Sequence, residues 1–80
     1  MMKYTIIIEK GESSYGAFVP DLPGCIAVGE TKQETIELIS EAIKFHIEGL
    51  HEDGNIIPTS HCNIAYVEVE TRTKQELNLI

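Results

Sequence analysis

The sequence predicts a single small α+β domain in which one helix covers one face of a mostly antiparallel sheet. Three short runs rich in β-branched or aromatic residues come first, and each is bounded by Gly, Pro or charged residues. One long stretch with apolar residues at spacings of three and four follows them, and a fourth run near the C-terminal end alternates in polarity. The expected order of elements is therefore β-β-β-α-β.

Length and composition limit the possible classes of protein. A chain of 80 residues forms one domain with a thin core, and its 42% hydrophobic and 24% charged residues are typical of a globular protein. No apolar run approaches the roughly 20 residues that span a bilayer, and the N-terminal residues show no signal-peptide pattern. We expect a cytoplasmic protein without a membrane partner.

The first three predicted strands form a meander. Residues 4–8 make the first strand and residues 15–19 the second, with a polar hairpin loop between them. Pro20 ends the second strand because it has no N–H to donate to the ladder. Residues 25–28 make a short, uncharged third strand.

A tight turn is predicted between the second and third strands, at Asp21, Leu22, Pro23 and Gly24. Proline presets φ for the second of the four positions of such a turn, and glycine accepts the positive φ of the third. We expect the role of these four residues to be structural first.

The helix has a strong start signal. The Thr31 hydroxyl can accept from the backbone N–H of Glu34, and the Glu34 carboxylate can reach back to the Thr31 N–H. The helix is expected to end near residues 49–54. Five apolar residues share the face that should cover the sheet: Ile36, Ile39, Ile43, Ile47 and Leu50.

Two other sides of the helix are candidate contact surfaces. Glu37, Glu41 and Glu48 lie together on the solvent side and are candidates for binding a partner. Leu38 and Phe45 lie on the far flank of the apolar stripe, where either a second molecule or a loop or tail of the same chain could cover them. Together with open sheet edges and a thin core, this flank favours a homodimer or higher homo-oligomer.

The last predicted strand covers residues 64–70, with Ala65, Val67 and Val69 facing inward. A helical crossover allows this strand to return parallel to the first strand and beside it, which gives the sheet order 3-2-1-4. Residues 1–70 are then the domain, and residues 71–80 are a C-terminal tail.

The sequence offers no recognisable catalytic or cofactor site. Its carboxylates show no spacing that would gather them around a metal ion, and His46 and His51 fall on different sides of the helix. Cys25 and Cys62 belong to no C-x-x-C pair, so free thiols are expected, although spacing alone leaves a bridge open. We expect a protein that is not an enzyme and binds neither a metal nor a cofactor.

The charge balance argues against nucleic acid as a partner. The formal net charge is −7, and most of it lies in residues 1–70, which hold twelve carboxylates and four lysines. Nucleic acids are bound largely through phosphate neutralisation by Lys and Arg. The charge favours a basic partner, and the alternative is that it only keeps a small protein soluble.

The segment Tyr15–Cys25 (YGAFVPDLPGC), together with Gly29-Glu30-Thr31 and the following helix, resembles the HicB-like antitoxin family. The resemblance implies a partial RNase H-like fold without nuclease residues. It also implies binding to a small basic HicA-like toxin, whose catalytic histidine and RNA-binding face would be masked. Many family members continue into a DNA-binding domain, whereas this chain ends at Ile80, so direct DNA binding is not expected from this chain alone.

Two alternatives to an antitoxin stay open from the sequence. The chain could be a stand-alone homo-oligomeric or ligand-binding module without a toxin, which the absence of a toxin gene beside its own would favour. It could also be a degenerate nuclease, for which metal-dependent RNA cleavage would be the evidence.

Overall fold

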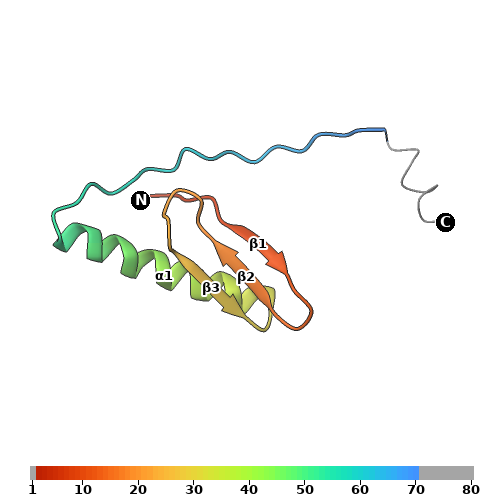
Figure 1. Ribbon diagram of the computed structural model, residues 1–80, viewed down its shortest axis with the longest axis horizontal. Helices are drawn as coiled ribbons and strands as arrows, with labels where there is room; N and C mark the ends of the chain where they lie inside the picture. Colours follow the sequence, from red (N-terminus) through yellow and green to blue (C-terminus); the bar gives the residue numbers. More distant parts are fainter. Residues whose placement is uncertain (1, 71–80) are drawn as a thin grey trace.

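The computed structural model describes residues 2–70 and has an α+β fold (Figure 1). Its elements are β1 (Ile7–Lys10), β2 (Tyr15–Phe18), β3 (Ile26–Gly29) and α1 (Lys32–Glu52). The strands form an antiparallel sheet in the order β1-β2-β3, and the helix covers one face of it. The predicted meander followed by a helix is confirmed, and the predicted C-terminal tail lies outside the described residues.

The strand register separates two faces of the sheet. Ala17 lies opposite Ile8 on one side and Ala27 on the other, and this row packs against the core beneath the helix. Side chains alternate along a strand, so the next row, which includes Phe18 and Ile26, lies on the opposite face. Both rows are apolar, although a helix covers only one of them.

The turn between β2 and β3 is part of the core. Leu22 lies at its centre and is fully buried, with 0% of its surface exposed. The Leu22 N–H donates to Val19 O at 3.1 Å, and the Cys25 N–H donates to Leu22 O at 3.0 Å. Gly24 has φ +85°, in the left-handed region that glycine adopts without strain. The backbone thus holds the Leu22 side chain inside the domain.

Thr31 caps the N-terminus of helix α1, and its side chain accepts from the Glu34 N–H at 3.0 Å. The Glu34 carboxylate accepts from the Glu30 N–H at 2.6 Å, not from the Thr31 N–H that the sequence predicted. The carboxylate therefore reaches one residue further toward the N-terminus, and it satisfies the amide that precedes the cap.

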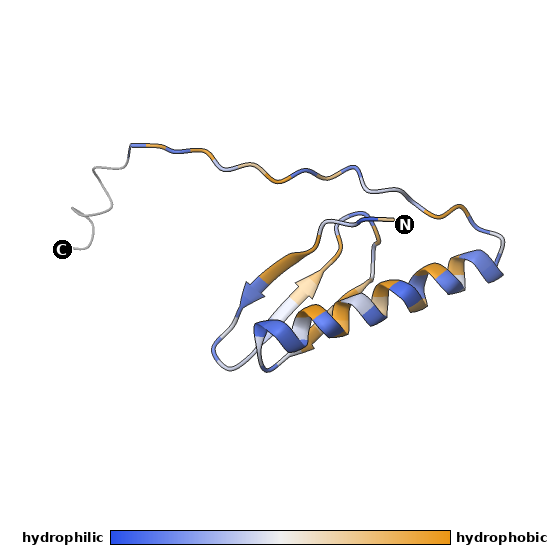
Figure 2. Cartoon of the chain, turned by 180° about the vertical axis from the view of Figure 1, so that it is seen from behind, coloured by the Kyte–Doolittle hydropathy of each residue, from blue (hydrophilic) through white to orange (hydrophobic). Residues whose placement is uncertain are grey.

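The first turns of α1 pack most closely on the sheet. Ile39 and Thr35 are fully buried, and the Thr35 hydroxyl donates to Thr31 O at 2.7 Å. A Cβ atom on Gly29 would lie 2.6 Å from the Thr35 hydroxyl oxygen, so the helix approaches the end of β3 only because Gly29 has no side chain. Four other residues of the predicted stripe are only half-buried: Ile36, Ile43, Ile47 and Leu50. Figure 2 shows apolar and polar residues alternating in short stretches along the helix.

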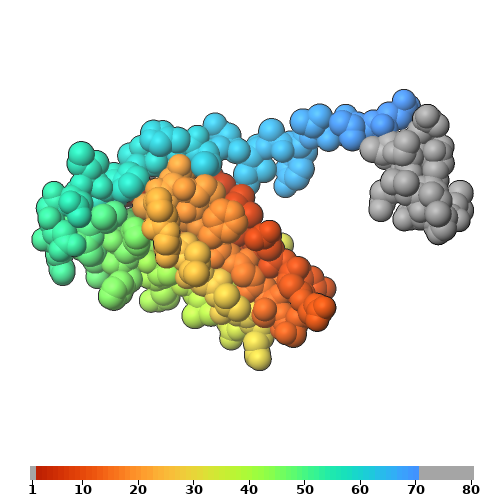
Figure 3. All heavy atoms as spheres, viewed as in Figure 1, coloured from red at the N-terminus to blue at the C-terminus, as the bar shows by residue number. Residues whose placement is uncertain are grey.

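The predicted fourth strand does not form within residues 2–70. Residues 64–70 are extended, but they pair with no strand, and Ala65, Val67 and Val69 are exposed instead of facing inward. The sheet therefore has three strands in the described part of the chain, and the position beside β1 is open. Residues 64–70 leave the domain instead of lying along β1 (Figure 3).

Candidate functional site

The three carboxylates predicted to bind a partner are all in solvent. Glu37, Glu41 and Glu48 are exposed along α1. Glu37 accepts one hydrogen bond from the Gln33 side chain at 3.3 Å, within the same helix. A helix face of this kind can meet a basic protein without first having to break contacts to the rest of the domain.

The Leu38/Phe45 flank is also accessible. Leu38 is 42% exposed and Phe45 is 75% exposed. Nothing within residues 2–70 covers Phe45, so in this part of the chain the reading in which a loop shields it does not hold. An exposed phenylalanine beside an exposed leucine is a typical contact point for a second protein.

The sheet carries a second apolar surface, which the sequence reasoning did not identify. Phe18, Ile26 and Val28 are exposed on the face away from α1. The only signal in the sequence was the absence of charge in the third strand. That signal indicates burial, but it does not say whether the helix or another molecule provides the cover.

A groove of about 590 Å³ lies between the residues that precede β1 and the second half of α1. Its apolar wall includes Tyr4 and Ile6 on one side and Ile39, Ile43 and Ile47 on the other. Lys3, Lys44 and Glu48 also line it. The groove follows the open edge at which the sequence predicted a fourth strand, and it was missed because that strand was expected to fill it.

Asp21 anchors the extended segment that follows the helix. Its Oδ2 accepts from the Ser60 hydroxyl at 3.2 Å, from the His61 N–H at 3.0 Å and from the Cys62 N–H at 3.3 Å. Its Oδ1 accepts from the Cys62 thiol at 3.5 Å. The sequence reasoning gave Asp21 only a role in the turn, because contacts nearly forty residues away leave no local pattern.

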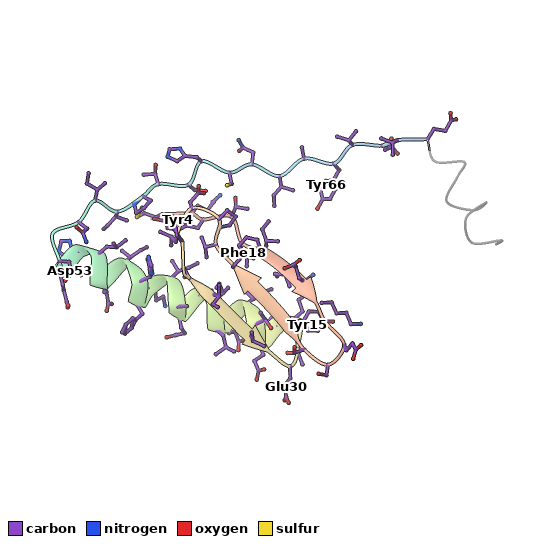
Figure 4. The ribbon with its side chains drawn as sticks, viewed as in Figure 1. Tyr4, Tyr15, Phe18, Glu30, Asp53 and Tyr66 are labelled. Atoms are coloured by element: carbon purple, nitrogen blue, oxygen red, sulfur yellow. The ribbon has the colours of Figure 1, made fainter. Side chains whose placement is uncertain are left out.

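Two side chains before β1 complete the anchor. The Tyr4 hydroxyl donates to Pro58 O, and the Thr5 hydroxyl donates to Cys62 O at 3.0 Å. Figure 4 shows Tyr4 next to the extended segment, whereas Tyr66 lies further along it, beyond the anchored part. Residues 58–62 are therefore attached to the domain, whereas residues 64–70 are exposed and make no such contact.

The anchor changes the acidity of its groups. Burial opposes ionisation of Asp21, but the hydrogen bonds from His61, Cys62 and Ser60 prevail and lower its pKa below the usual 3.8. Burial, together with the hydrogen bond to the Asp21 carboxylate and its charge, raises the pKa of the Cys62 thiol above the usual 9.0. Burial raises the pKa of Cys25 as well. Both cysteines are free, and at neutral pH both are protonated thiols.

The histidines and carboxylates do not form a metal centre in the described part of the chain, where no three potential ligands group together. His46 is half-buried beside the apolar stripe, and His51 and His61 are exposed. No helix among residues 2–70 combines the length and hydrophobicity needed to cross a bilayer. The accessible surfaces described above are the acidic side of α1, the Leu38/Phe45 flank, the apolar outer face of the sheet and the groove.

These surfaces lie on a small α+β domain with a three-stranded antiparallel sheet and one helix. A solved structure of similar fold is the crystal structure of the N-terminal domain of the Burkholderia pseudomallei antitoxin HicB. The two match with a TM-score of 0.58 and 32% identity, over 91% of this chain and 75% of that one. Residues 4–77 match the model of the HicB-like antitoxin of bacterial toxin-antitoxin systems, and the chain belongs to this family.

Relatives of different lengths share the domain. An uncharacterized 14.9 kDa protein of Haemophilus phage HP1 is 47% identical over 60 residues, which are 75% of this chain and 45% of the phage protein. A UPF0150 protein of Thermoplasma acidophilum is 48% identical over 71% of this chain and 84% of its own. Antitoxin HicB 2 of Photorhabdus laumondii is 30% identical over 85% of this chain and 50% of its own length. The chain thus spans about half of the phage protein and of this antitoxin.

Proposed function

We propose that this chain is an antitoxin that neutralises a small basic, mRNA-cleaving toxin of the HicA-like type by covering its active surface. The observation that carries the proposal is the exposed acidic face of α1, at Glu37, Glu41 and Glu48, in a chain of the HicB-like antitoxin family. The chain acts by binding and not by catalysis, and it acts in the cytoplasm, where the toxin would meet messenger RNA.

The mechanism follows from charge. Residues 1–70 carry twelve carboxylates and four lysines, a net charge of −8. A toxin that binds RNA presents cationic side chains to the phosphates, and the carboxylates of α1 would bind the same cationic side chains. The domain would therefore compete with RNA, and long-range attraction would speed the encounter.

Self-association is the second part of the proposal. The domain is small and has two open sheet edges, and Leu38 and Phe45 stand exposed on a flank of α1 separate from the acidic side. We assign this flank to a contact between copies of the chain, in a homodimer or a higher oligomer. The three strands and the helix support a partial RNase H-like arrangement, in which a fourth strand would pair with the open edge of β1.

The test is the kinetics of association with a HicA-like toxin from the same cell, followed as ionic strength rises from about 0.05 to 0.5 M, where the Debye length shrinks to a few ångströms. Association should slow steeply with salt, while dissociation should change less because apolar contacts govern it. Reversing all three charges (Glu37→Lys, Glu41→Lys, Glu48→Lys) should slow association and flatten its salt dependence.

A second triple variant is the matched control, because it changes the net charge by the same amount at positions outside α1. Glu9→Lys, Glu12→Lys and Glu30→Lys reverse three exposed carboxylates in and around the strands. Equal slowing by both triple variants would show that only net charge matters. An association rate indifferent to salt and to the α1 reversals would refute masking by these carboxylates, and no binding at all would leave the alternative of a module without a toxin.

A further inference from the structure

We infer that residues 64–70 pair, as a fourth strand, with the open edge of β1 in a second copy of the chain, and cover its groove. The inference adds a second contact between copies of the chain to the flank contact proposed above, and it does not depend on toxin binding. It rests on two features of the same chain. One is the unpaired edge of β1, and the other is the extended segment 64–70, which pairs with no strand.

The first incomplete feature is the β1 edge. β1 has β2 on one side and no neighbour on the other within residues 2–70. The groove lies beside the residues that lead into β1, and the half-buried Ile43 and Ile47 of α1 line its other side. An unpaired edge next to partly exposed apolar side chains is a template for an added strand.

The second incomplete feature is the extended segment. Residues 64–70 have the composition and the alternation of a strand, yet they make no hydrogen bond to one. Tyr66 is 93% exposed and Val67 is 82% exposed. Apolar residues occur on both faces, with Ile64 and Tyr66 on one and Ala65, Val67 and Val69 on the other. Such a strand needs cover on both sides, which a free segment in water does not have.

The anchor at Asp21 directs the segment outward. Residues 60–62 are held by Asp21, and Cys62 O is held by Thr5, just before β1 begins. From Asn63 onward every residue to Glu70 is exposed, and the segment runs past its own sheet edge without joining it (Figures 1 and 3). Its own edge therefore stays open to the segment of another copy.

Charge identifies the occupant as a second copy and not as the basic toxin. Among residues 2–70 there are four lysines, and three lie at this edge: Lys3 and Lys44 line the groove, and Lys10 ends β1. The segment carries Glu68 and Glu70 and no cationic residue. The same edge carries two carboxylates, Glu9 of β1 and Glu48 of the groove, so its lysines outnumber its carboxylates by one. An acidic strand complements this edge better than a cationic toxin would.

Reciprocal exchange gives a closed two-fold dimer, because each copy offers one edge and one strand. One face of the incoming strand would cover Ile43 and Ile47. The other face would extend the apolar row that contains Phe18 and Ile26. Exchange therefore completes the sheet order 4-1-2-3 with a strand from the second molecule.

The test is zero-length carbodiimide cross-linking of the full chain, because it joins a lysine to a carboxylate in contact. An equal mixture of ¹⁴N- and ¹⁵N-labelled chains is denatured, refolded together, cross-linked and digested. We expect peptides that join Lys3, Lys10 or Lys44 to Glu68 or Glu70, and we expect pairs of mixed isotope among them. Same-isotope pairs alone would mean that the segment joins its own β1, and the absence of these links would mean that it does not lie there. Either result overturns the exchange.

Oligomer size provides an independent measurement, in a Phe45→Glu background that removes the contact of the helix flank. Sedimentation at tens of micromolar should show a dimer for Phe45→Glu, a monomer after adding Val67→Asp, and a dimer after adding Ile56→Asp instead. Ile56 is the matched control because it is 89% exposed in the same extended stretch but precedes the anchor. A monomeric Phe45→Glu chain would overturn the exchange, and a monomeric wild-type chain would overturn the proposed self-association itself. Persistence of the mixed-isotope links in Val67→Asp would also contradict the inference.

Discussion

The folded domain and the segment after it are built from similar residues, but only one of them is packed. β-branched and aromatic residues fill both, yet the core gathers around Leu22 and Ile39, while residues 64–70 are exposed throughout. The difference lies in connection. Short turns bring β1, β2, β3 and α1 onto one another, whereas the segment is held at Asp21 and then leaves. A strand-like sequence pattern therefore shows that a segment can pair with a neighbouring strand. Whether it does so depends on how the rest of the chain folds.

The largest effect that separates the two regions is expected from Ile39→Ala. Ile39 is buried to 1% exposure at the centre of the core, so the variant should lower the free energy of unfolding by about 2 to 5 kcal/mol. Ile43→Ala should cost less, because Ile43 is only half-buried. Leu38→Ala on the same helix and Ile56→Ala in the segment are the controls, expected within about 0.5 kcal/mol. Denaturant titration measures all four, and equal losses at Ile39 and Ile56 would remove the distinction between the regions.

A smaller loss is expected from the turn that carries Leu22. Gly24 has φ +85°, and a Cβ there would meet nothing within 4 Å, so Gly24→Val should cost about 1 to 2 kcal/mol through backbone strain alone. Gly24→Asn should cost less, because asparagine tolerates this conformation better. Thermal and denaturant unfolding compare the two variants. Equal stability of the wild type and Gly24→Val would show that the turn has another geometry.

The helix cap should contribute about 1 kcal/mol. Thr31→Ala removes the acceptor for the Glu34 N–H, whereas Thr31→Ser keeps it and is the matched control. The difference between the two in a denaturant titration isolates the hydrogen bond. No difference would mean that water replaces the threonine hydroxyl at no cost.

The anchor should affect global unfolding least and local opening most. Asp21→Asn weakens the acceptor for the His61 and Cys62 amides, so hydrogen exchange at these two amides should become faster while exchange in α1 stays unchanged. The pKa of Asp21 is lowered in the folded protein, so the anchor is fully present above the usual pKa of 3.8 and is lost as pH falls through the lower folded value. In the wild type, exchange at these amides, corrected for the intrinsic pH dependence, should therefore rise below about pH 4. The same acid-induced change in Asp21→Asn would assign it to another group.

Sequence reasoning was sufficient where structure depends on neighbours in the chain. The meander, the positive φ of Gly24, the Thr31 cap of α1 and the burial of Ile39 all follow from local chemistry and helical spacing. Helical spacing also gave Ile43 an equally central place, but Ile43 is only half-buried. Sequence reasoning failed where a residue meets a distant one. The Asp21 anchor joins residues about forty positions apart. The strand expected at residues 64–70 was placed beside the first strand by general topology rules alone, and no local pattern in the sequence specified that pairing. The exposure of Glu37, Glu41 and Glu48 was predictable from spacing, but spacing cannot say what they bind.

The short connections of the domain also set the order in which its parts can form. Among residues 2–70, every buried apolar residue lies between Ala17 and Ile39, so the contacts of this core close small loops of chain and carry a low entropic barrier. On a ribosome that adds about 5 to 20 residues per second, the meander and the helix can be complete before residues 64–70 are free to pair. Folding of each copy is then a first-order event, and any pairing of its last strand with a second copy is a later, concentration-dependent one. The abundance of the chain in the cell would decide how often that second event follows the first.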